Sequence, residues 1–168
     1  LLAGLVKVTS KGPAFFTQVR VGKDGRLFNM VKLRTMRQNA EHSSGPVWAR
    51  EHDPRITTLG FLLRLSHLDE LPQLWNVLRG DMSLVGPRPE RPFFVNQFRR
   101  NIPNYEMRLS VKPGITGLAQ VKYKYDETVE DVAKKLAYDL TYIRDMSWWL
   151  EFKILFWTLG TLTGKGAR

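Results

Sequence analysis

The chain has 168 residues, 43% of them hydrophobic, which is enough for one compact domain with a real core. Its 26 basic and 16 acidic side chains leave a formal charge of +10, so we expect a polyanionic partner: nucleic acid, an anionic membrane surface or a phosphorylated substrate. The chain has no cysteine, which excludes disulfides and thiolate metal sites and fits a cytosol-facing domain.

The first ten residues open on Leu-Leu-Ala-Gly-Leu-Val-Lys-Val and lack the basic region and the cleavage site of a signal peptide. No stretch of the sequence reaches the roughly twenty apolar residues that span a bilayer. Because the chain opens abruptly on this apolar run without an initiator methionine, we expect a membrane-associated helix upstream, with residues 1–10 as its tail. Residues 11–168 are predicted to form the single domain.

A β-hairpin is predicted near residues 15–33. Two apolar runs, at 15–21 and 27–33, flank the turn Gly22-Lys23-Asp24-Gly25, whose residues favour reversal of the chain. Lys32 lies in the second run, and by itself it would most often be a solvated strand residue.

A surface loop is predicted at residues 37–50, because His-Ser-Ser-Gly-Pro breaks any periodicity there. His42 and His52 could suggest a metal site, but no helical or strand spacing unites them with carboxylates. Scattered surface histidines are the favoured interpretation. Asp53, in Asp-Pro-Arg-Ile-Thr, is predicted to cap a turn.

The stretch at residues 65–90 reads LSHLDELPQLWNVLRGDMSLVGPRPE. Asp69 is predicted at or near the N-cap of a helix that runs to about Arg79 and is ended by Gly80. An Asp-Glu pair in such a place is most often only a cap, although the positive end of a helix also favours ionised carboxylates and phosphate. The helical spacing predicts a buried stripe made of Leu71, Leu74, Trp75 and Leu78.

Two arginines flank this helix. Arg64 lies about one turn upstream of Asp69 and adds positive charge there. Arg88 lies between Pro87 and Pro89, and this rigid loop suits a preorganised bidentate grip on a diphosphate. A lone Pro-Arg-Pro would more often be a surface turn, so Arg88 is a candidate for substrate binding only together with the preceding stretch that carries Asp69 and Glu70.

Further helices are predicted at residues 91–108, 129–142 and 147–162, with a shaped loop, not a regular strand, at 111–121. The first helix has basic and aromatic residues that could contact nucleic acid or lipid headgroups. The apolar stripe of the second consists of Val132, Leu136, Leu140 and Ile143. The third is rich in tryptophan and suits a membrane interface, with a packed core helix as the open alternative.

The string from Leu68 to Pro89 is similar to the signature of the bacterial sugar transferases, the monotopic polyprenol phosphate phosphoglycosyl transferases. Residues 28–36 resemble the family's aromatic-x-x-x-Lys-Phe-Arg-Ser-Met element, with Leu33 and Thr35 as departures. Residues 112–120 resemble its Lys-Pro-Gly-Ile-Thr-Gly-Leu-x-Gln element. His67 also departs, since serine is commoner there, and this could alter hydrogen bonding or pH response near the site.

The resemblance implies transfer of a sugar 1-phosphate from a UDP-sugar to polyprenyl (undecaprenyl) phosphate, with release of UMP, to initiate exopolysaccharide, capsule or O-antigen assembly. Asp69 would be the nucleophile and would form a covalent sugar-phosphate ester. Glu70 would hold Mg²⁺ or orient the acceptor, and the metal would lie at Asp69 and Glu70 as a charge clamp.

The resemblance also implies substrate contacts. Lys32, Arg64 and Arg88 would offset phosphate charge. Gln120 would face the substrate or, as the favoured alternative, support packing. Asp139, in Tyr-Asp-Leu-Thr-Tyr, would support the site, with capping or an ion pair equally open.

The expected fold is a compact α+β domain, mainly helical, with a short hairpin and interfacial amphipathic helices. The resemblance implies a monotopic protein of the bacterial inner membrane that faces the cytoplasm, contacts an anionic membrane surface and binds no nucleic acid. Larger relatives dimerise, and nothing in the sequence decides this for the chain. Two other classes stay open: a basic nucleic-acid-binding module, without a recognisable motif, and a non-catalytic membrane-surface protein.

Overall fold

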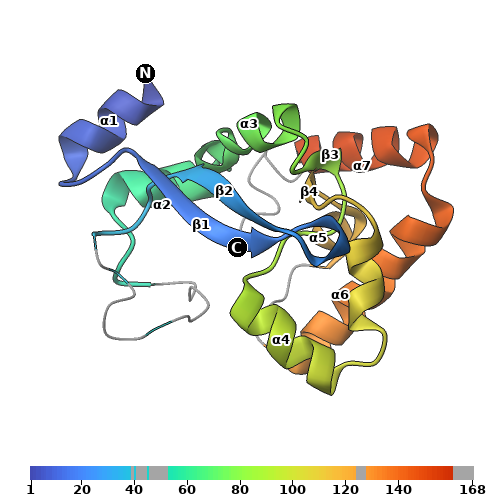
Figure 1. The fold of residues 1–168 in the computed structure, drawn as a ribbon. Coiled ribbons are helices and arrows are strands. Elements are labelled where there is room, and N and C mark those ends of the chain that lie inside the picture. Colours follow the sequence, from blue (N-terminus) through green and yellow to red (C-terminus); the bar gives the residue numbers. More distant parts are fainter. Residues whose placement is uncertain (39, 41–44, 46–52, 124–127, 161–168) are drawn as a thin grey trace.

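The computed structural model describes residues 1–38, 40, 45, 53–123 and 128–160 (Figure 1). Most of the loop predicted at 37–50, with His42 and His52, lies outside the described residues. The helices are α1 Leu2–Thr9, α2 Thr58–Leu65, α3 Gln73–Leu78, α4 Pro92–Asn101, α5 Leu118–Lys122, α6 Val129–Asp145 and α7 Trp148–Gly160. The strands are β1 Phe15–Val21, β2 Leu27–Leu33, β3 Ser83–Val85 and β4 Gly114–Thr116. Short 3₁₀ turns are η1 Lys23–Gly25, η2 Leu68–Glu70 and η3 Tyr105–Ser110.

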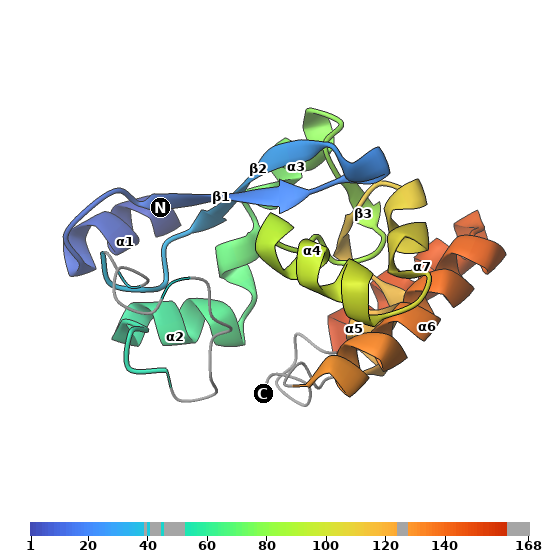
Figure 2. The ribbon, with the colours of Figure 1, turned by 60° about the horizontal axis from the view of Figure 1, so that its bottom comes forward.

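The predicted hairpin is confirmed. Strands β1 and β2 pair antiparallel, from Phe15 opposite Leu33 to Val21 opposite Leu27. Gly25, at φ +77°, supplies the left-handed backbone that the turn requires. In two views the hairpin joins the part of the molecule that holds α1 and α2 to the part that holds α4, α5, α6 and α7 (Figures 1 and 2).

The loop prediction for residues 111–121 is wrong in two places, because Gly114–Thr116 forms strand β4 and helix α5 begins at Leu118. This strand pairs in parallel with β3, with Ser83 opposite Gly114 and Val85 opposite Thr116. Glycine makes this pairing possible: a Cβ on Gly114 would collide with the backbone of Gly86, and one on Gly117 would do the same. The two segments therefore approach more closely than side chains would allow.

The core is organised around α6, which begins at a capping box formed by Thr128 and Asp131. Val132 and Leu136 are buried against α4 and η3, while Leu140 packs at the edge of the same cluster. Further along, α6 joins a second cluster with β3, α5 and α7. The apolar stripe predicted for this helix is confirmed.

The helix predicted at 91–108 is interrupted. Helix α4 ends at Asn101, and η3 follows after Asn104, whose φ of +62° cannot continue a right-handed helix. Helix α7 packs on the core: Ile154 is fully buried, and Leu150, Leu155 and Trp157 are partly buried against the same cluster. Other large residues of the helix are exposed, namely Trp148, Trp149, Phe152 and Phe156, and a position at a membrane interface stays a prediction.

The prediction for residues 69–79 is wrong in two respects. Asp69 caps no helix, because it lies inside η2, and α3 begins only at Gln73, after Pro72. The stripe expected to be buried is exposed by 45–80%: Leu71, Leu74, Trp75 and Leu78. Helix α3 instead turns Gln73 and Asn76 inward, with 2% and 1% of their surfaces exposed, and Gly80 follows its end at φ +82°.

Helix α1 packs on the domain through Val6, which lies in a small core cluster with Leu33 of β2 and Leu63 of α2. In the described part of the chain, no helix combines the length and the apolar character that crossing a bilayer requires. The architecture is a mainly helical α+β domain, as expected.

Candidate active site

The centre of the candidate site is the Glu70 carboxylate in η2, between α2 and α3. Its Oε1 accepts a hydrogen bond from Lys32 Nζ at 2.7 Å and another from Arg88 Nη2 at 2.8 Å. Lys32 comes from β2, and Arg88 comes from the loop after β3. Two residues predicted for the site, Lys32 and Arg88, thus converge from distant segments on one oxygen atom of a third, Glu70.

These ion pairs set the protonation state of Glu70. Burial alone would raise its pKa, but Arg88 and Lys32 outweigh burial, and the pKa lies well below its ordinary value. Burial lowers the pKa of Lys32, and Glu70 is the main group that opposes this. Glu70 is therefore an ionised carboxylate that two cations hold in place.

Asp69 has the opposite surroundings. Only 7% of its surface is exposed, and its carboxylate makes no hydrogen bond or ion pair with the residues that the structure describes. Burial raises its pKa; Lys32 opposes the rise and Glu70 adds to it. Two neighbouring carboxylates whose pKa values are pushed apart are typical of sites where the two groups have different tasks.

Arg64 is placed by α2, which packs tightly on the end of β2. A Cβ on Gly60 would collide with the carbonyl of Thr35, so only glycine permits this approach. Arg64 Nε donates to Thr35 Oγ1 at 2.9 Å. Burial lowers the pKa of Arg64, and Asp69 is the strongest of the charges that oppose this, so the arginine adds positive potential at that carboxylate.

Gln120 has a structural contact. It lies in α5, and its Nε2 donates to the carbonyl of Ile115 in β4 at 2.9 Å. No contact among the described residues joins it to Asp69 or Glu70. Support of the β3–β4 pair is therefore its observed role, and contact with substrate stays a prediction.

Asn76 is a residue of the site region that the sequence did not reveal. Its Nδ2 donates to the Asn29 carbonyl at 2.8 Å, and its Oδ1 accepts from the Val31 N–H at 3.1 Å. The side-chain amide thus acts like a neighbouring strand and ties α3 to β2 just before the position of Lys32. The only signal in the sequence was an amide in the middle of a short helix.

Arg108, in η3, is a second residue that sequence reasoning missed. It is buried, and its Nε donates to Asp139 Oδ2 at 2.9 Å, which confirms the ion-pair alternative for Asp139. Its Nη2 also donates to the backbone carbonyl of Arg88 at 2.9 Å. Asp139 thus reaches the site through an intermediate arginine that no local pattern in the sequence indicated.

The two carboxylates of the site fit a magnesium ion. No cluster of three or more metal-binding side chains exists among the described residues. Mg²⁺ at phosphate sites needs only one or two carboxylates, because water and phosphate oxygens complete its coordination. Glu70 Oε2 and both oxygens of Asp69 accept no hydrogen bond within the described part of the chain, so they suit this role.

The chain is similar to known proteins over nearly its whole length. The model of the family described as "Bacterial sugar transferase" matches residues 1–165. A UDP-N-acetylgalactosamine-undecaprenyl-phosphate N-acetylgalactosaminephosphotransferase of Aeromonas hydrophila is 48% identical over 99% of this chain and 39% of its own length. A UDP-glucose:undecaprenyl-phosphate glucose-1-phosphate transferase of Klebsiella pneumoniae is 47% identical over 95% of this chain and 34% of its own length.

A third relative is the enzyme of the same name from Caulobacter vibrioides, which is 45% identical over 96% of this chain and 61% of its own length. The chain therefore spans between about a third and three fifths of these relatives. A family match over nearly the whole chain, together with identities of this size, leads to one conclusion. The chain belongs to the bacterial sugar transferase family.

Proposed function

We propose that the protein transfers a sugar 1-phosphate from a UDP-sugar to undecaprenyl phosphate and so initiates assembly of a bacterial polysaccharide. Products would be an undecaprenyl diphosphate sugar and UMP. The observation that carries the proposal is the asymmetry of the carboxylate pair, in which Glu70 is ion-paired twice and Asp69 is paired with none of the described residues. The names of the relatives support the choice of donor and acceptor.

In the first step, an oxygen of Asp69 attacks the phosphorus that bears the sugar. A bond forms between that oxygen and phosphorus, and the bond from phosphorus to the bridging oxygen breaks, so UMP leaves with the bridging oxygen. In the second step, an oxygen of undecaprenyl phosphate attacks the same phosphorus and releases the Asp69 carboxylate. With two displacements, the site reacts with only one anionic reactant at a time.

The pKa values support this division of tasks. A carboxylate with a raised pKa is a more basic nucleophile, and no lysine or arginine among the described residues is bonded to the oxygens of Asp69. Glu70, held by Lys32 and Arg88, is poorly suited to attack. Its proposed role is to hold those two cations where the diphosphate binds.

Repulsion between the Asp69 carboxylate and a diphosphate opposes the first step. Lys32, Arg64 and Arg88 surround the carboxylate pair and offset that repulsion. When Mg²⁺ is bound at Asp69 and Glu70, it supplies additional positive charge for the phosphate oxygens.

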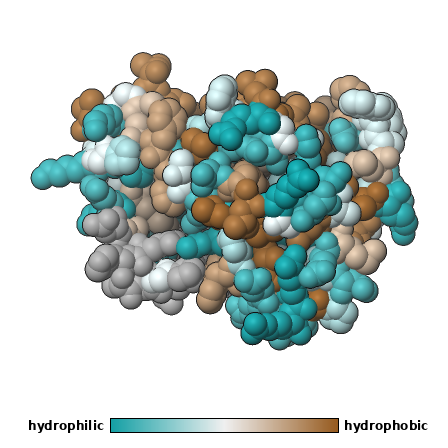
Figure 3. Space-filling model, in the orientation of Figure 1, coloured by the Kyte–Doolittle hydropathy of each residue, from teal (hydrophilic) through white to brown (hydrophobic). Residues whose placement is uncertain are grey.

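We also propose that the protein lies on an anionic membrane, where a polyprenyl acceptor resides. Large apolar side chains that are 37–80% exposed lie in the segments that flank the carboxylate pair in the sequence, from α2 to α3: Phe61, Leu62, Leu65, Leu68, Leu71, Leu74, Trp75 and Leu78. Figure 3 shows hydrophobic residues along the edge of the molecule where α1, α3 and α7 lie. Together with the net charge of +10, this surface suits partial burial among lipid headgroups.

The test is intact mass spectrometry of the full-length protein after incubation with Mg²⁺ and a panel of UDP-sugars, without acceptor. We expect a sugar-phosphate adduct that maps to Asp69, with release of UMP. Asp69→Asn should lower UMP release by about a thousandfold or more, because the nucleophile is lost.

The matched control is Asp24→Asn. Asp24 is exposed in the hairpin turn at φ +55°, a conformation that asparagine tolerates, so this variant should form the adduct normally. If acceptor and donor turn over together without any adduct, direct transfer replaces the two-step mechanism. If no UDP-sugar is consumed with or without acceptor, the proposed function is wrong.

A further inference from the structure

The segment Pro87–Glu90 is held by its backbone carbonyls. Prolines 87 and 89 have no N–H, so the segment presents mainly acceptors and only donors can fix it. Each of its four carbonyl oxygens accepts a hydrogen bond from a different partner: Gly114 N at 3.0 Å for Pro87, Arg108 Nη2 at 2.9 Å for Arg88, Arg20 Nη1 at 2.9 Å for Pro89, and Val21 N at 2.9 Å for Glu90.

Two of these four donors are side chains, and both belong to arginines other than the one that pairs with Glu70. We propose that Arg108 is a positioning residue: its hold on the Arg88 carbonyl sets the Arg88 guanidinium against Glu70 and against the diphosphate of the donor. Arg20 fixes the next residue in the same way, through its hydrogen bond to the Pro89 carbonyl. This inference rests on the proposed function, because it concerns the arginine that would grip the donor.

Arg108 is itself fixed on every side of its guanidinium. Nε donates to Asp139 Oδ2 of α6 at 2.9 Å, Nη2 lies 2.8 Å from the same oxygen in an ion pair, and Nη1 donates to the Tyr105 hydroxyl at 2.8 Å. The planar fork of arginine can satisfy these acceptors and the Arg88 carbonyl together, which the single ammonium of lysine cannot do. Through Asp139 and Arg108, helix α6 thereby fixes the position of the Arg88 backbone.

The charges indicate that Arg108 positions Arg88 and does not itself attract the phosphate. Asp139 neutralises Arg108 in a pair with 8% and 3% of the side chains exposed, so this pair adds little net charge to the site. Arg20 likewise faces Glu90 at 3.5 Å. The phosphate would therefore meet the charge of Arg88, while the two other arginines determine where that charge lies.

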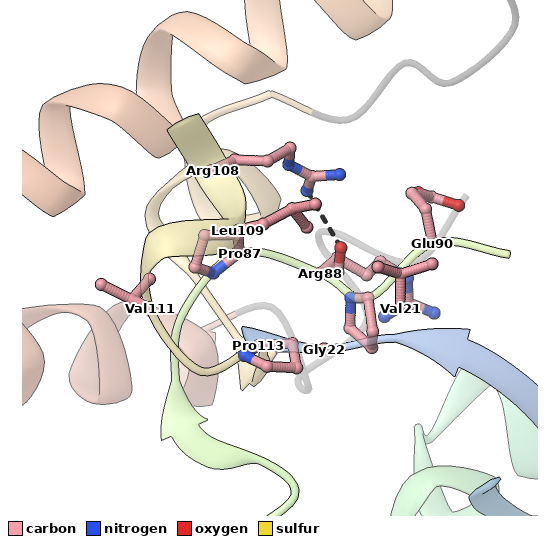
Figure 4. Close-up of a pocket in the computed structure, with 10 residues that line it drawn as sticks. Val21, Gly22, Pro87, Arg88, Glu90, Arg108, Leu109, Val111 and Pro113 are labelled. Atoms are coloured by element: carbon pink, nitrogen blue, oxygen red, sulfur yellow. Dashed lines mark hydrogen bonds between the residues drawn. The ribbon is translucent and has the colours of Figure 1, made fainter. Parts of the chain in front are cut away.

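Side-chain packing does not replace these hydrogen bonds. The bond from Arg108 to the Arg88 carbonyl lies at the wall of a cavity of about 10 Å³, which Leu109, Val111 and Pro113 also line (Figure 4). Such a space holds about one water molecule at most. The Arg88 loop is thus incompletely packed on this side, and loss of the Arg108 hold would leave it free to shift.

A double-mutant cycle separates positioning from a purely structural role. Arg108→Lys, Arg88→Ala and the double variant are compared by kcat/KM for UMP release, together with urea unfolding of each. We expect Arg108→Lys to lower kcat/KM by about 10- to 100-fold, because a small displacement of a binding group has an effect of that size. In the Arg88→Ala background, the same substitution should cause no further loss.

Arg144→Lys is the matched control, since Arg144 is an exposed arginine that pairs with its neighbour Asp145, and its kcat/KM should stay near that of the wild type. A second readout needs no turnover: nuclear magnetic resonance of the arginine side chains. The Arg88 guanidinium signal should broaden or move in Arg108→Lys and stay unchanged in Arg144→Lys.

Equal losses from Arg108→Lys in both backgrounds, or an unchanged Arg88 signal, would overturn the positioning role. Wild-type protein that releases no UMP from any donor would overturn the proposed function instead, and the resonance measurement would still decide whether Arg108 fixes Arg88.

Discussion

Helices α3 and α6 present apolar residues at the same helical spacing, yet they use them in opposite ways. Helix α6 buries Val132 and Leu136 in the core, whereas α3 exposes 80% of Leu78 and buries Asn76. The reason lies outside both helices: α6 meets apolar partners on α4, and α3 meets the open backbone edge of β2, which only a polar side chain can satisfy. Periodicity identifies an apolar face but does not tell what will cover it.

The sharpest test of this contrast removes one leucine from each helix. Leu136→Ala should lower the free energy of unfolding by about 2–5 kcal/mol, because it leaves a cavity in the core. Leu78→Ala should change it by no more than about 0.5 kcal/mol, since that side chain already faces outward. Urea unfolding followed by circular dichroism measures both, and equal losses would show that α3 is packed in solution.

The polar inner face of α3 should give the next largest effect. Asn76→Ala leaves the Asn29 carbonyl and the Val31 N–H without their partner, and we expect a loss of about 1–3 kcal/mol. Hydrogen exchange at the Val31 amide should become faster in this variant. Asn96→Ala, at an exposed position of α4, is the matched control and should leave both quantities nearly unchanged. If the exchange rate at Val31 does not change, Asn76 does not protect β2.

The two carboxylates beside α3 should affect stability with opposite signs in metal-free protein, because their pKa values are shifted in opposite directions. The pKa of Glu70 lies below its ordinary 4.5, so its ionised form stabilises the fold above pH 4.5, and this contribution is lost as the pH falls below that value. The pKa of Asp69 is raised above 3.8, so its ionised form destabilises the fold at neutral pH.

Unfolding with urea in the presence of a chelator, from pH 7 down to pH 3.5, measures these contributions. At pH 7, Asp69→Asn should be more stable than the wild type, and Glu70→Gln should be less stable. Both differences should shrink on acidification: that of Asp69→Asn as the pH falls through the raised pKa of Asp69, and that of Glu70→Gln below 4.5. A loss of stability in Asp69→Asn at pH 7 would contradict the assigned surroundings of the carboxylate.

The smallest effect on unfolding, below about 0.5 kcal/mol, is expected from Trp75→Gln on the outer face of α3. Its effect on membrane binding should be larger, about tenfold weaker binding to anionic vesicles, because an apolar side chain is lost from the contact. Phe93→Gln is the control: Phe93 is 56% exposed and Trp75 58%, but α4 lies on the other side of the molecule (Figure 1). Vesicle sedimentation that treats both variants alike would argue against a membrane surface at α3.

Local patterns were sufficient to predict the hairpin and α6. The turn residues of the hairpin and the apolar stripe of α6 can each be identified within a short stretch of sequence. The convergence of Lys32, Glu70 and Arg88 was predicted only through the resemblance of whole strings to a family. The β3–β4 pair escaped prediction because it joins segments about thirty residues apart, and its glycines look like loop residues in isolation. Arg108 escaped for the same reason: its partners are distant in the sequence.

Asn76 also has a consequence for how this protein behaves beside other chains. A two-stranded sheet exposes unpaired backbone groups along its outer edges, and such edges recruit strands from neighbouring molecules. By bonding to Asn29 and Val31, a single side-chain amide blocks the middle of the outer edge of β2 against strand addition. The residue that aligns α3 with β2 should therefore also hinder edge-to-edge association of the hairpin with neighbouring chains.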